Sequence, residues 1–516
     1  MRILTTICIS LLLAGCASDA QIRRAKIEKP DDGAVVMRVL SSVMRGNQVL
    51  SVFAQRWDMV TVEREPDHTD ETLHRFVIQR TKAATTRSTI YAASLPPGHY
   101  QIVSFSSSKL AGPNRTANGW LTADSLFSRF DVEAGKLTDL GAIVETVDGV
   151  NPPDGIEGFS RLILSHDTTP VAVEDEEIVR EMVPGLATLL SNGKTLTWRP
   201  ETIPGDMSRR QAYALSSSYG FTSPQEVEPG KFLVGSANGV VYLWENGRRI
   251  AVYDLGQRSS VEAVLIAGDG SWLAGGEFGL LKVSNDKGAT WRSLRGNLPF
   301  STVLDLHEWK GKIVATTMQG EYIDIYSAAL GKKEWELLAH YSRSSTEWDY
   351  WMRPDSFLLS GHLVTAFPPA QKIGLLDLDS GNKIEYDLPG SIQFISASQD
   401  GVLRCKCNKL LLPMPYESHD FGKTWIESSA SRWMQLPAFH DADHGVAILA
   451  ALKPPSKFVY TEDGGKVWTP VEDAPLMPAS NKLFWSRDGK TAYSVAADGE
   501  SYLSRDDGHS WLRLPQ

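Results

Sequence analysis

Ser284-Asn285-Asp286-Lys287-Gly288-Ala289-Thr290-Trp291 is an eight-residue pattern that returns at residues 418–425, 461–468 and 504–511. The last three copies start 43 residues apart. A fixed period of about 40–50 residues is typical of propellers and solenoid arrays. The repeat therefore predicts an array of similar β units over the C-terminal part of the chain.

Each copy lies between two apolar, alternating runs, such as residues 280–283 and 291–294 around the first. Such runs on either side of an Asp- and Gly-containing turn predict a β-hairpin. The Asp can accept hydrogen bonds from turn N–H groups, the Gly supplies a positive φ, and the Trp covers the neighbouring sheet. We interpret these residues as braces of the turn; catalysis or metal binding is the alternative for the Asp. The residues are Asp286, Gly288, Trp291, Asp420, Gly422, Trp425, Asp463, Gly465, Trp468, Asp506, Gly508 and Trp511.

The pattern Ser/Thr-x-Asp-x-Gly-x-Thr/Ser-Trp resembles the Asp-box, or BNR repeat, of sialidase-like β-propellers. The resemblance covers roughly residues 185–516 and implies a propeller domain there. It also implies that the boxes are structural and lie away from the active face. The copy at 461 departs from the pattern, because Val467 stands where Thr is usual.

Decayed hairpins extend the array. Segments near 241, 327 and 377 raise the number of hairpins to seven. We place the blades at 205–257, 258–298, 299–343, 344–389, 390–430, 431–474 and 475–516, lengths that suit four-stranded blades. Residues 186–199 predict two further strands, either half of an eighth blade or a closure piece. The expected fold is all-β, an N-terminal β-sandwich followed by a seven-bladed β-propeller, with eight blades as the alternative.

The N-terminus predicts export. Arg2 precedes a short apolar run at 3–13, which suits a signal-peptide core and is too short to span a bilayer. Leu13-Ala14-Gly15-Cys16 resembles the bacterial lipobox, which implies a signal peptide at 1–15 and acylation (palmitate or a similar chain) of Cys16. A soluble chain with an incidental apolar start is the alternative. Ala17 and Ser18 follow Cys16, so the second mature position is not Asp. By the same resemblance this implies an outer-membrane lipoprotein that faces the periplasm or lies at the cell surface.

Residues 16–32 are expected to be a lipidated tether and 33–148 a β-sandwich domain, because short alternating runs recur with turn signals about every 10 residues. Residues 95–105 and 130–135 resemble transthyretin-like or carboxypeptidase-regulatory-like modules. We interpret 149–184 as a junction that contains a short helix at 174–183, where acidic residues lie at the N-terminal end.

Composition excludes some classes of function. The chain has 52 basic and 62 acidic residues and a net charge of −10, which argues against nucleic acid as the main partner. No cofactor is expected. Cys405 and Cys407 point to one face of a strand about 6.6 Å apart, too far for an unstrained disulfide. We interpret them as packing residues, and a redox or intermolecular role is the alternative.

Two loops are candidate sites. His440, Asp441, Asp443 and His444 have the side chains of a metal site, and a polar hairpin turn is the alternative. The second candidate is an aromatic partner-binding patch, for which burial between blades is the alternative. This patch consists of Trp348, Tyr350, Trp351 and Arg353.

The catalytic residues of sialidases are not recognisable, because no Arg-Ile-Pro motif occurs. Arg353, Arg404 and Arg432 fall in successive blades and predict either a basic centre or surface residues. We expect the chain to be a membrane-anchored lipoprotein whose propeller binds a protein or glycan partner in a non-enzymatic scaffold or assembly role. The predicted propeller resembles photosystem assembly-factor and sortilin-type propellers. A sialidase-like glycoside hydrolase is the alternative.

Overall fold

The computed structural model divides into two compact units, one made mainly of residues up to 215 and the other mainly of residues from 216 onward. The described residues are 21–45, 48–51, 57–66, 73–84, 88–107, 117–121, 128–148, 159–166, 174–192, 194–195, 224–236, 239–245, 248–257, 259–342, 354–367, 371–398, 400–409, 412–428, 434–449, 457–475, 481–496 and 501–514. Within these ranges no helix is long and apolar enough to cross a membrane.

The described strands up to residue 195 form one sheet, in the order β12-β10-β11-β8-β7-β4-β5-β6-β2-β3, with β1 on β5 and β9 on β7. Their bounds are β1 Gln21–Arg23, β2 Gly33–Arg45, β3 Gln48–Ser51, β4 Met59–Arg64, β5 His74–Ala84, β6 Ser88–Leu95, β7 Gly98–Ser107, β8 Ala117–Leu121, β9 Arg129–Val132, β10 Leu137–Asp148, β11 Phe159–His166 and β12 Lys194–Thr195.

This sheet closes on itself, because β10 pairs with β2 in parallel as well as with β11. Where the sequence predicts a sandwich, the structure therefore has one sheet that continues around a single core. Trp57, Tyr91, Tyr100, Phe105 and Phe130 are all at most 1% exposed in that core. The stacked rings of Tyr100 and Phe130 join the paired strands β7 and β9.

The segment after β11 differs from the expectation. The helix predicted at 174–183 is present as α2 (Glu174–Met182). Residues 186–199 were expected to form two strands, but Pro184–Asn192 is a 3₁₀ helix, η1, and β12 pairs with β10 of the first unit. The side chain of Asn192 also donates to the carbonyl of Gly135 at 2.8 Å. The described part of this segment therefore adds no strand to the propeller.

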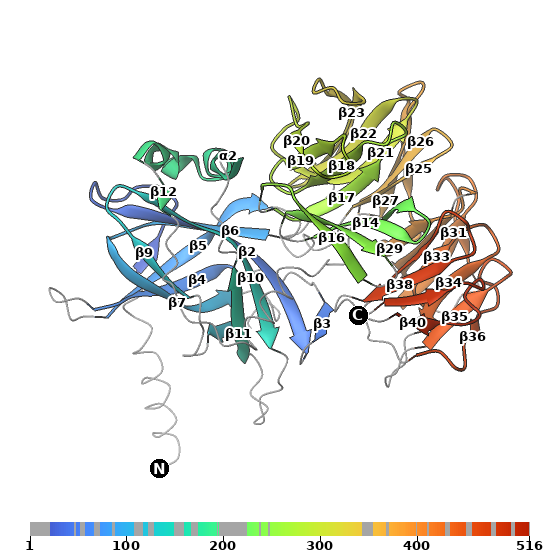
Figure 1. Ribbon diagram of the computed structural model, residues 1–516, viewed down its shortest axis with the longest axis horizontal. Coiled ribbons are helices and arrows are strands. Elements are labelled where there is room, and N and C mark those ends of the chain that lie inside the picture. Colours follow the sequence, from blue (N-terminus) through green and yellow to red (C-terminus); the bar gives the residue numbers. More distant parts are fainter. Residues whose placement is uncertain are drawn as a thin grey trace, which may run out of the picture. The chain divides into compact units, whose positions relative to one another are not determined.

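The described strands from residue 225 onward form seven four-stranded sheets, a seven-bladed β-propeller, as predicted. Figure 1 shows these sheets following one another along the chain from green to red. Blades 1 to 4 are β13 Gln225–Glu228, β14 Lys231–Gly235, β15 Val240–Glu245, β16 Arg248–Asp254; β17 Val261–Ile266, β18 Trp272–Gly276, β19 Leu281–Ser284, β20 Arg292–Ser293; β21 Thr302–Trp309, β22 Lys312–Gln319, β23 Tyr322–Ala329, β24 Glu336–Ser342; and β25 Asp355–Leu359, β26 His362–Ala366, β27 Lys372–Asp377, β28 Lys383–Asp387. Blades 5 to 7 are β29 Ser391–Ala397, β30 Leu403–Lys409, β31 Leu412–Ser418, β32 Ile426–Glu427; β33 Met434–Phe439, β34 Gly445–Leu449, β35 Lys457–Thr461, β36 Thr469–Pro470; and β37 Asn481–Trp485, β38 Ala492–Ala496, β39 Ser501–Ser504, β40 Leu512–Arg513.

The four repeated turns join the third and fourth strands of blades 2, 5, 6 and 7, and they share one hydrogen-bond pattern. In the first turn, Asp286 Oδ1 accepts the Ser284 hydroxyl and the Thr290 N–H, both at 2.8 Å, and Oδ2 accepts the Thr290 hydroxyl at 2.6 Å. The Ser284 oxygen accepts the Gly288 N–H at 2.7 Å. The turns that start at 418 and 504 repeat all four bonds. The turn at 461 repeats three, because Val467 has no hydroxyl.

Two constraints favour glycine at the fifth position of the repeated turn: a positive φ and the close approach of the preceding blade. Gly288 has φ 90°, and a Cβ there would lie 2.7 Å from the ring of Tyr253 in blade 1. Gly422 has φ 87°, and a Cβ would lie 2.0 Å from Ile373 in blade 4. These two turns therefore pack directly on the blade before them, and a side chain there would strain the backbone and push the blades apart.

Candidate functional site

Buried apolar clusters that draw on both neighbouring blades fill six of the interfaces between consecutive blades in the described residues. They join blades 1 and 2, 2 and 3, 3 and 4, 4 and 5, 6 and 7, and 7 and 1. Between blades 5 and 6 the described residues place two cationic side chains and a cavity instead. We call this region the 5/6 cleft and define it by Phe394, Arg404, Lys406, Pro415, Pro437, Phe439 and Trp468.

Arg404 on β30 holds one side of the 5/6 cleft. It is 8% exposed, and its guanidinium carbon lies 3.5 Å from the centre of the Phe439 ring in blade 6. Its Nη2 donates to the carbonyl of Ala442 at 2.8 Å. Burial lowers the pKa of Arg404, and the carboxylate of Glu417 opposes that shift. Arg404 is thus committed to a contact between blades, while Arg353 and Arg432 lie outside the described residues.

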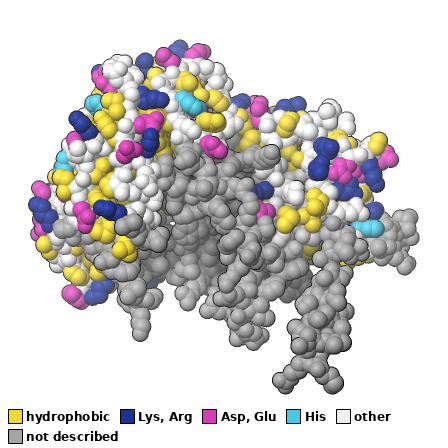
Figure 2. Space-filling view, turned by 180° about the vertical axis from the view of Figure 1, so that it is seen from behind, with side chains coloured by type: hydrophobic (Ala, Val, Ile, Leu, Met, Phe, Trp, Pro, Cys, Tyr) yellow, Lys and Arg dark blue, Asp and Glu magenta, His cyan; other side chains and the backbone are white. Residues whose placement is uncertain are grey.

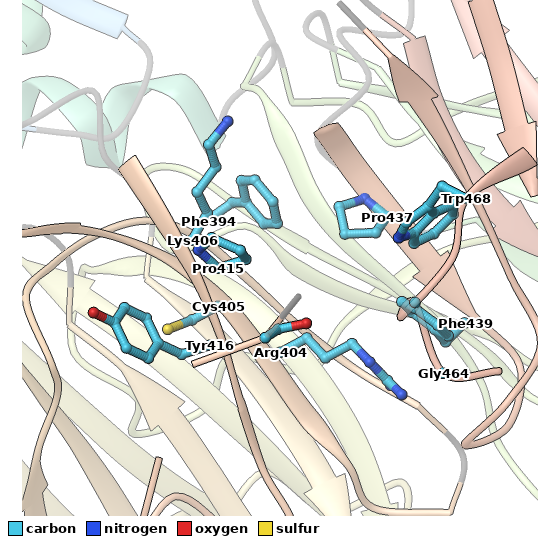
Figure 3. Close-up of a pocket in the computed structure, with 12 residues that line it drawn as sticks. Phe394, Arg404, Cys405, Lys406, Pro415, Tyr416, Pro437, Phe439, Gly464 and Trp468 are labelled. Atoms are coloured by element: carbon cyan, nitrogen blue, oxygen red, sulfur yellow. The ribbon is translucent and has the colours of Figure 1, made fainter. Parts of the chain in front are cut away.

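The cavity in the 5/6 cleft has a volume of about 30 Å³, room for about two water molecules. Figure 3 shows Phe394, Lys406 and Pro415 on one side of it and Pro437, Phe439 and Trp468 on the other. Lys406 Nζ lies 6.0 Å from the centre of the Phe394 ring, and burial lowers the pKa of Lys406. The cleft therefore combines an apolar lining with a partly desolvated cation.

Gly465 is placed differently from its counterparts in the other three repeated turns, whereas Trp468 shares a buried indole N–H without a partner in the described residues with Trp291 of blade 2. The indole N–H groups of Trp425 and Trp511 donate to the carbonyls of Gly422 and Gly508. Trp468 Nε1 is buried and has no hydrogen-bond partner among the described residues. The atoms nearest a Cβ on Gly465 belong to Trp468 and Phe439 of the same blade, not to blade 5. The glycine of this turn therefore does not pack against blade 5, and a cavity remains between the two blades.

The loop at 440–444 adjoins the cleft, because it follows Phe439 directly. The structure brings together three of the four predicted metal ligands, His440, Asp441 and His444, with their ligand atoms within 4.8 Å of one another. Asp443 is not part of this group of three. His440 Nδ1 and His444 Nδ1 lie 3.3 and 3.0 Å from Asp441 Oδ2.

Hydrogen bonds set the charge state of this loop. Burial disfavours the charged form of Asp441, but bonds from the N–H and ring of His444 outweigh it and hold the pKa of the carboxyl below its usual value. The same hydrogen bond, which the His444 ring donates to Asp441, raises the pKa of His444, and the carboxylates of Asp507 and Asp443 add to this effect. As it stands, the group is a carboxylate between two imidazoles, which serves either as an ion pair or as a metal-binding set.

A second cluster has the residue types of a hydrolase but a different geometry. The Ser356 hydroxyl of blade 4 lies 3.0 Å from His307 Nε2 and 3.2 Å from Asp305 Oδ2, both on β21 of blade 3. In a catalytic triad the Asp orients the His and the His contacts the Ser, whereas here the hydroxyl lies between the other two groups. Ser356 is 6% exposed, and burial lowers the pKa of His307. We interpret the cluster as a polar bond between blades.

The remaining predicted residues divide into two groups. Cys405 and Cys407 are free and buried in the core between blades 4 and 5. The hydrogen bond that the Cys405 thiol makes to Cys407, together with burial, raises the pKa of that thiol, so the thiolate is disfavoured. The anchor Cys16 and the patch Trp348, Tyr350, Trp351 and Arg353 lie outside the described residues.

Phe394, Lys406 and Pro437 line the cleft without a recognisable signal in the sequence. Each lies in a strand or just inside its end, where an apolar or long side chain is ordinary. No short-range pattern marks them, since the cleft arises only where two blades meet.

Comparison with known proteins finds similar solved structures but no related sequence. No protein-family model matches the chain, and no curated protein is detectably similar in sequence. YCF48 bound to D1 peptide is 14% identical, covering 58% of this chain and 95% of that one, with a TM-score of 0.41. The designed Ika8 protein is 15% identical over 58% and 88%, with a TM-score of 0.40. The GH74 xyloglucanase from Xanthomonas campestris is 13% identical over 59% and 75%, with a TM-score of 0.35. At these values no activity or ligand transfers to this chain.

Proposed function

We propose that this chain is a lipoprotein of the outer membrane, acylated at Cys16, whose propeller binds a protein partner in a non-enzymatic scaffold or assembly role. The lipobox and the short apolar run before it support the anchor. The repeated turns support membership of the Asp-box propellers, since the bonds of Asp286 serve the turn itself. We also propose that the anchored chain faces the periplasm or lies at the cell surface.

The 5/6 cleft carries the binding part of the proposal. Trp, Tyr and Arg are the side chains enriched among the residues that dominate the energetics of protein interfaces. Phe394, Phe439 and Trp468 supply the rings, and Lys406 supplies a cation beside them. An unpartnered indole N–H costs free energy, which a carbonyl of a bound peptide relieves. A cavity with room for about two waters suits the tip of an apolar side chain and not a sugar ring.

The surface charge is compatible with such a partner. Figure 2 shows basic, acidic and apolar side chains interspersed over the described part of the face it presents. An interspersed surface does not build the single-sign potential that draws in nucleic acid. Recognition would then depend on local fit at the cleft.

The test is site-specific photocrosslinking in cells. A photoreactive phenylalanine analogue replaces Phe394 in the cleft, and in a matched control it replaces Tyr322, which is 50% exposed in blade 3. The proposal expects a discrete protein adduct from position 394 and none of the same mass from position 322. Equal adducts from both positions, or none from 394, would count against it. If the purified chain hydrolyses a fluorogenic sialoside, the non-enzymatic proposal is wrong and the sialidase-like hydrolase is favoured.

A second pair of variants tests the indole N–H. Trp468→Phe removes an N–H without a partner, while Trp425→Phe removes one that donates to Gly422 at 3.0 Å. If a partner supplies the acceptor, Trp468→Phe weakens binding while Trp425→Phe lowers the melting temperature and leaves binding intact. The reverse pattern would remove Trp468 from the interface.

A further inference from the structure

We propose that the loop at residues 440–444 binds one divalent transition-metal ion through the imidazoles of His440 and His444 and the carboxylate of Asp441. The two imidazole Nδ1 atoms lie 3.3 and 3.0 Å from Asp441 Oδ2. Around a tetrahedral ion with bonds of about 2.0–2.1 Å, neighbouring ligand atoms lie about 3.3–3.4 Å apart. The two nitrogen–oxygen distances are therefore close to the spacing that such an ion imposes, and all three ligand atoms lie within 4.8 Å of one another.

Hydrogen bonds that form without a metal ion hold the backbone of the loop in place. Asp441 Oδ1 accepts the N–H groups of Asp443 at 2.9 Å and His444 at 2.6 Å. The carbonyl of Asp443 accepts the Gly464 N–H at 2.8 Å, and that of Ala442 accepts from Arg404 at 2.8 Å. A loop fixed in this way loses little conformational entropy when it binds a ligand.

One ring must turn to complete the site. The two imidazoles are 5.4 Å apart and within 9° of parallel, so an ion cannot lie in the plane of both as they stand. The edge-on contact of Trp485 with the His440 ring, at 4.8 Å, holds His440, whose side chain is 18% exposed. The His444 side chain is 40% exposed. His444 is the ring expected to rotate, because the torsion next to an imidazole has a broad, shallow energy profile.

The donor set and the local charge select the class of ion. Two nitrogens and one carboxylate oxygen favour Zn²⁺, Co²⁺, Ni²⁺ or Cu²⁺ over Ca²⁺ and Mg²⁺, which prefer oxygen ligands throughout. Asp441, Asp443 and Asp507 all act electrostatically on His444. The guanidinium of Arg404, which interacts with Asp441 and Asp443, opposes them. Three carboxylates against one guanidinium leave the loop attractive to a dication.

The test is titration of the full chain, purified without a histidine tag, with Zn²⁺ in a calorimeter. Wild type is expected to bind one ion per chain, and His444→Ala and Asp441→Asn to bind it at least tenfold more weakly. Asp441→Asn is the sharper variant, since its amide oxygen still accepts the two loop N–H groups. Co²⁺ is expected to give a visible absorption band in wild type that both variants lose.

The matched control is His340→Ala. His340 Nδ1 lies 2.6 Å from Asp324 Oδ1, an exposed His–Asp pair of blade 3 that belongs to no group of three ligands in the described residues. The proposal expects this variant to bind Zn²⁺ as wild type does. It is overturned if wild type and Asp441→Asn, folded to the same melting temperature without metal, bind Zn²⁺ equally, or if His340→Ala loses as much affinity as His444→Ala.

Discussion

Glu226 and Ser486 are 260 residues apart in sequence, and the Ser486 hydroxyl donates to Glu226 Oε1 at 2.6 Å. Glu226 Oε2 also accepts the N–H of Arg487 at 2.7 Å. Glu226 belongs to the first strand of blade 1, and Ser486 follows the first strand of blade 7. Each described blade is built from one continuous stretch of chain, so no shared strand joins these two blades. Side chains therefore close the ring here, with Phe232 and Phe484 packed edge to face beside the carboxylate.

The first prediction concerns this closure. Glu226→Ala is expected to lower the free energy of unfolding by about 2–3 kcal/mol, because it leaves a buried hydroxyl and N–H without their charged acceptor. Urea denaturation followed by tryptophan fluorescence measures it. Glu228→Ala is the control, since Glu228 is on the same strand but exposed and paired only with lysine at the surface. Equal losses of unfolding free energy in the two variants would mean that the bond between Glu226 and Ser486 stabilises the protein no more than a surface ion pair does.

The second prediction uses the incomplete turn at 461. Val467 is 63% exposed and stands where the other turns have a hydroxyl that donates to the Asp. Val467→Thr is expected to raise the free energy of unfolding by about 0.5–1 kcal/mol, because Thr can add the missing bond to Asp463. Differential scanning calorimetry measures the shift. Val467→Ala, which cannot form the bond, should gain nothing; a gain equal to that of Thr would point to the loss of an exposed apolar group instead.

The third prediction follows from the acidity of the turn. The hydroxyl and N–H of Thr290, with the hydroxyl of Ser284, lower the pKa of Asp286 to about 2, against about 3.9 in an unfolded chain. A lowered pKa in the folded state gives a stability that is full above the unfolded value and is lost as the pH falls toward the folded one. The stability difference between wild type and Asp286→Asn should thus be constant from about pH 7 to 5 and shrink between about pH 4 and 2. Denaturation curves at a series of pH values measure it, and a difference that does not change with pH would contradict the assignment.

The fourth prediction concerns the anchor. Cys16→Ser removes the thiol that the lipobox presents for acylation, so the chain should move from the membrane fraction to the soluble fraction and lose labelling by a palmitate analogue. Cys405→Ser is the control, because its thiol is buried in the propeller. Labelling that persists in Cys16→Ser would contradict acylation at Cys16.

Local chemistry was sufficient to predict the propeller. The turn that begins at Ser284 contains its own hydrogen-bond donors, acceptors and left-handed glycine within eight residues, and its repetition at a fixed spacing sets the number of hairpins. The sequence likewise predicted the helix α2 and the three residues His440, Asp441 and His444 that converge, because a five-residue loop keeps them close in any fold.

Contacts between distant segments were decided only by the tertiary structure. The parallel pairing of β2 with β10 closes the first sheet, and Glu226 with Ser486 closes the propeller; neither pair has a local signal. The strands predicted at 186–199 were wrong over Pro184–Asn192, because a short apolar run does not by itself distinguish a buried helical segment from a buried strand. The 5/6 cleft depends on how two blades pack, since Arg404, Phe394 and Trp468 become neighbours only when blades 5 and 6 meet. Turns and strands are fixed by residues a few positions apart, whereas a cleft is fixed by the fit of surfaces from segments that are far apart in the sequence.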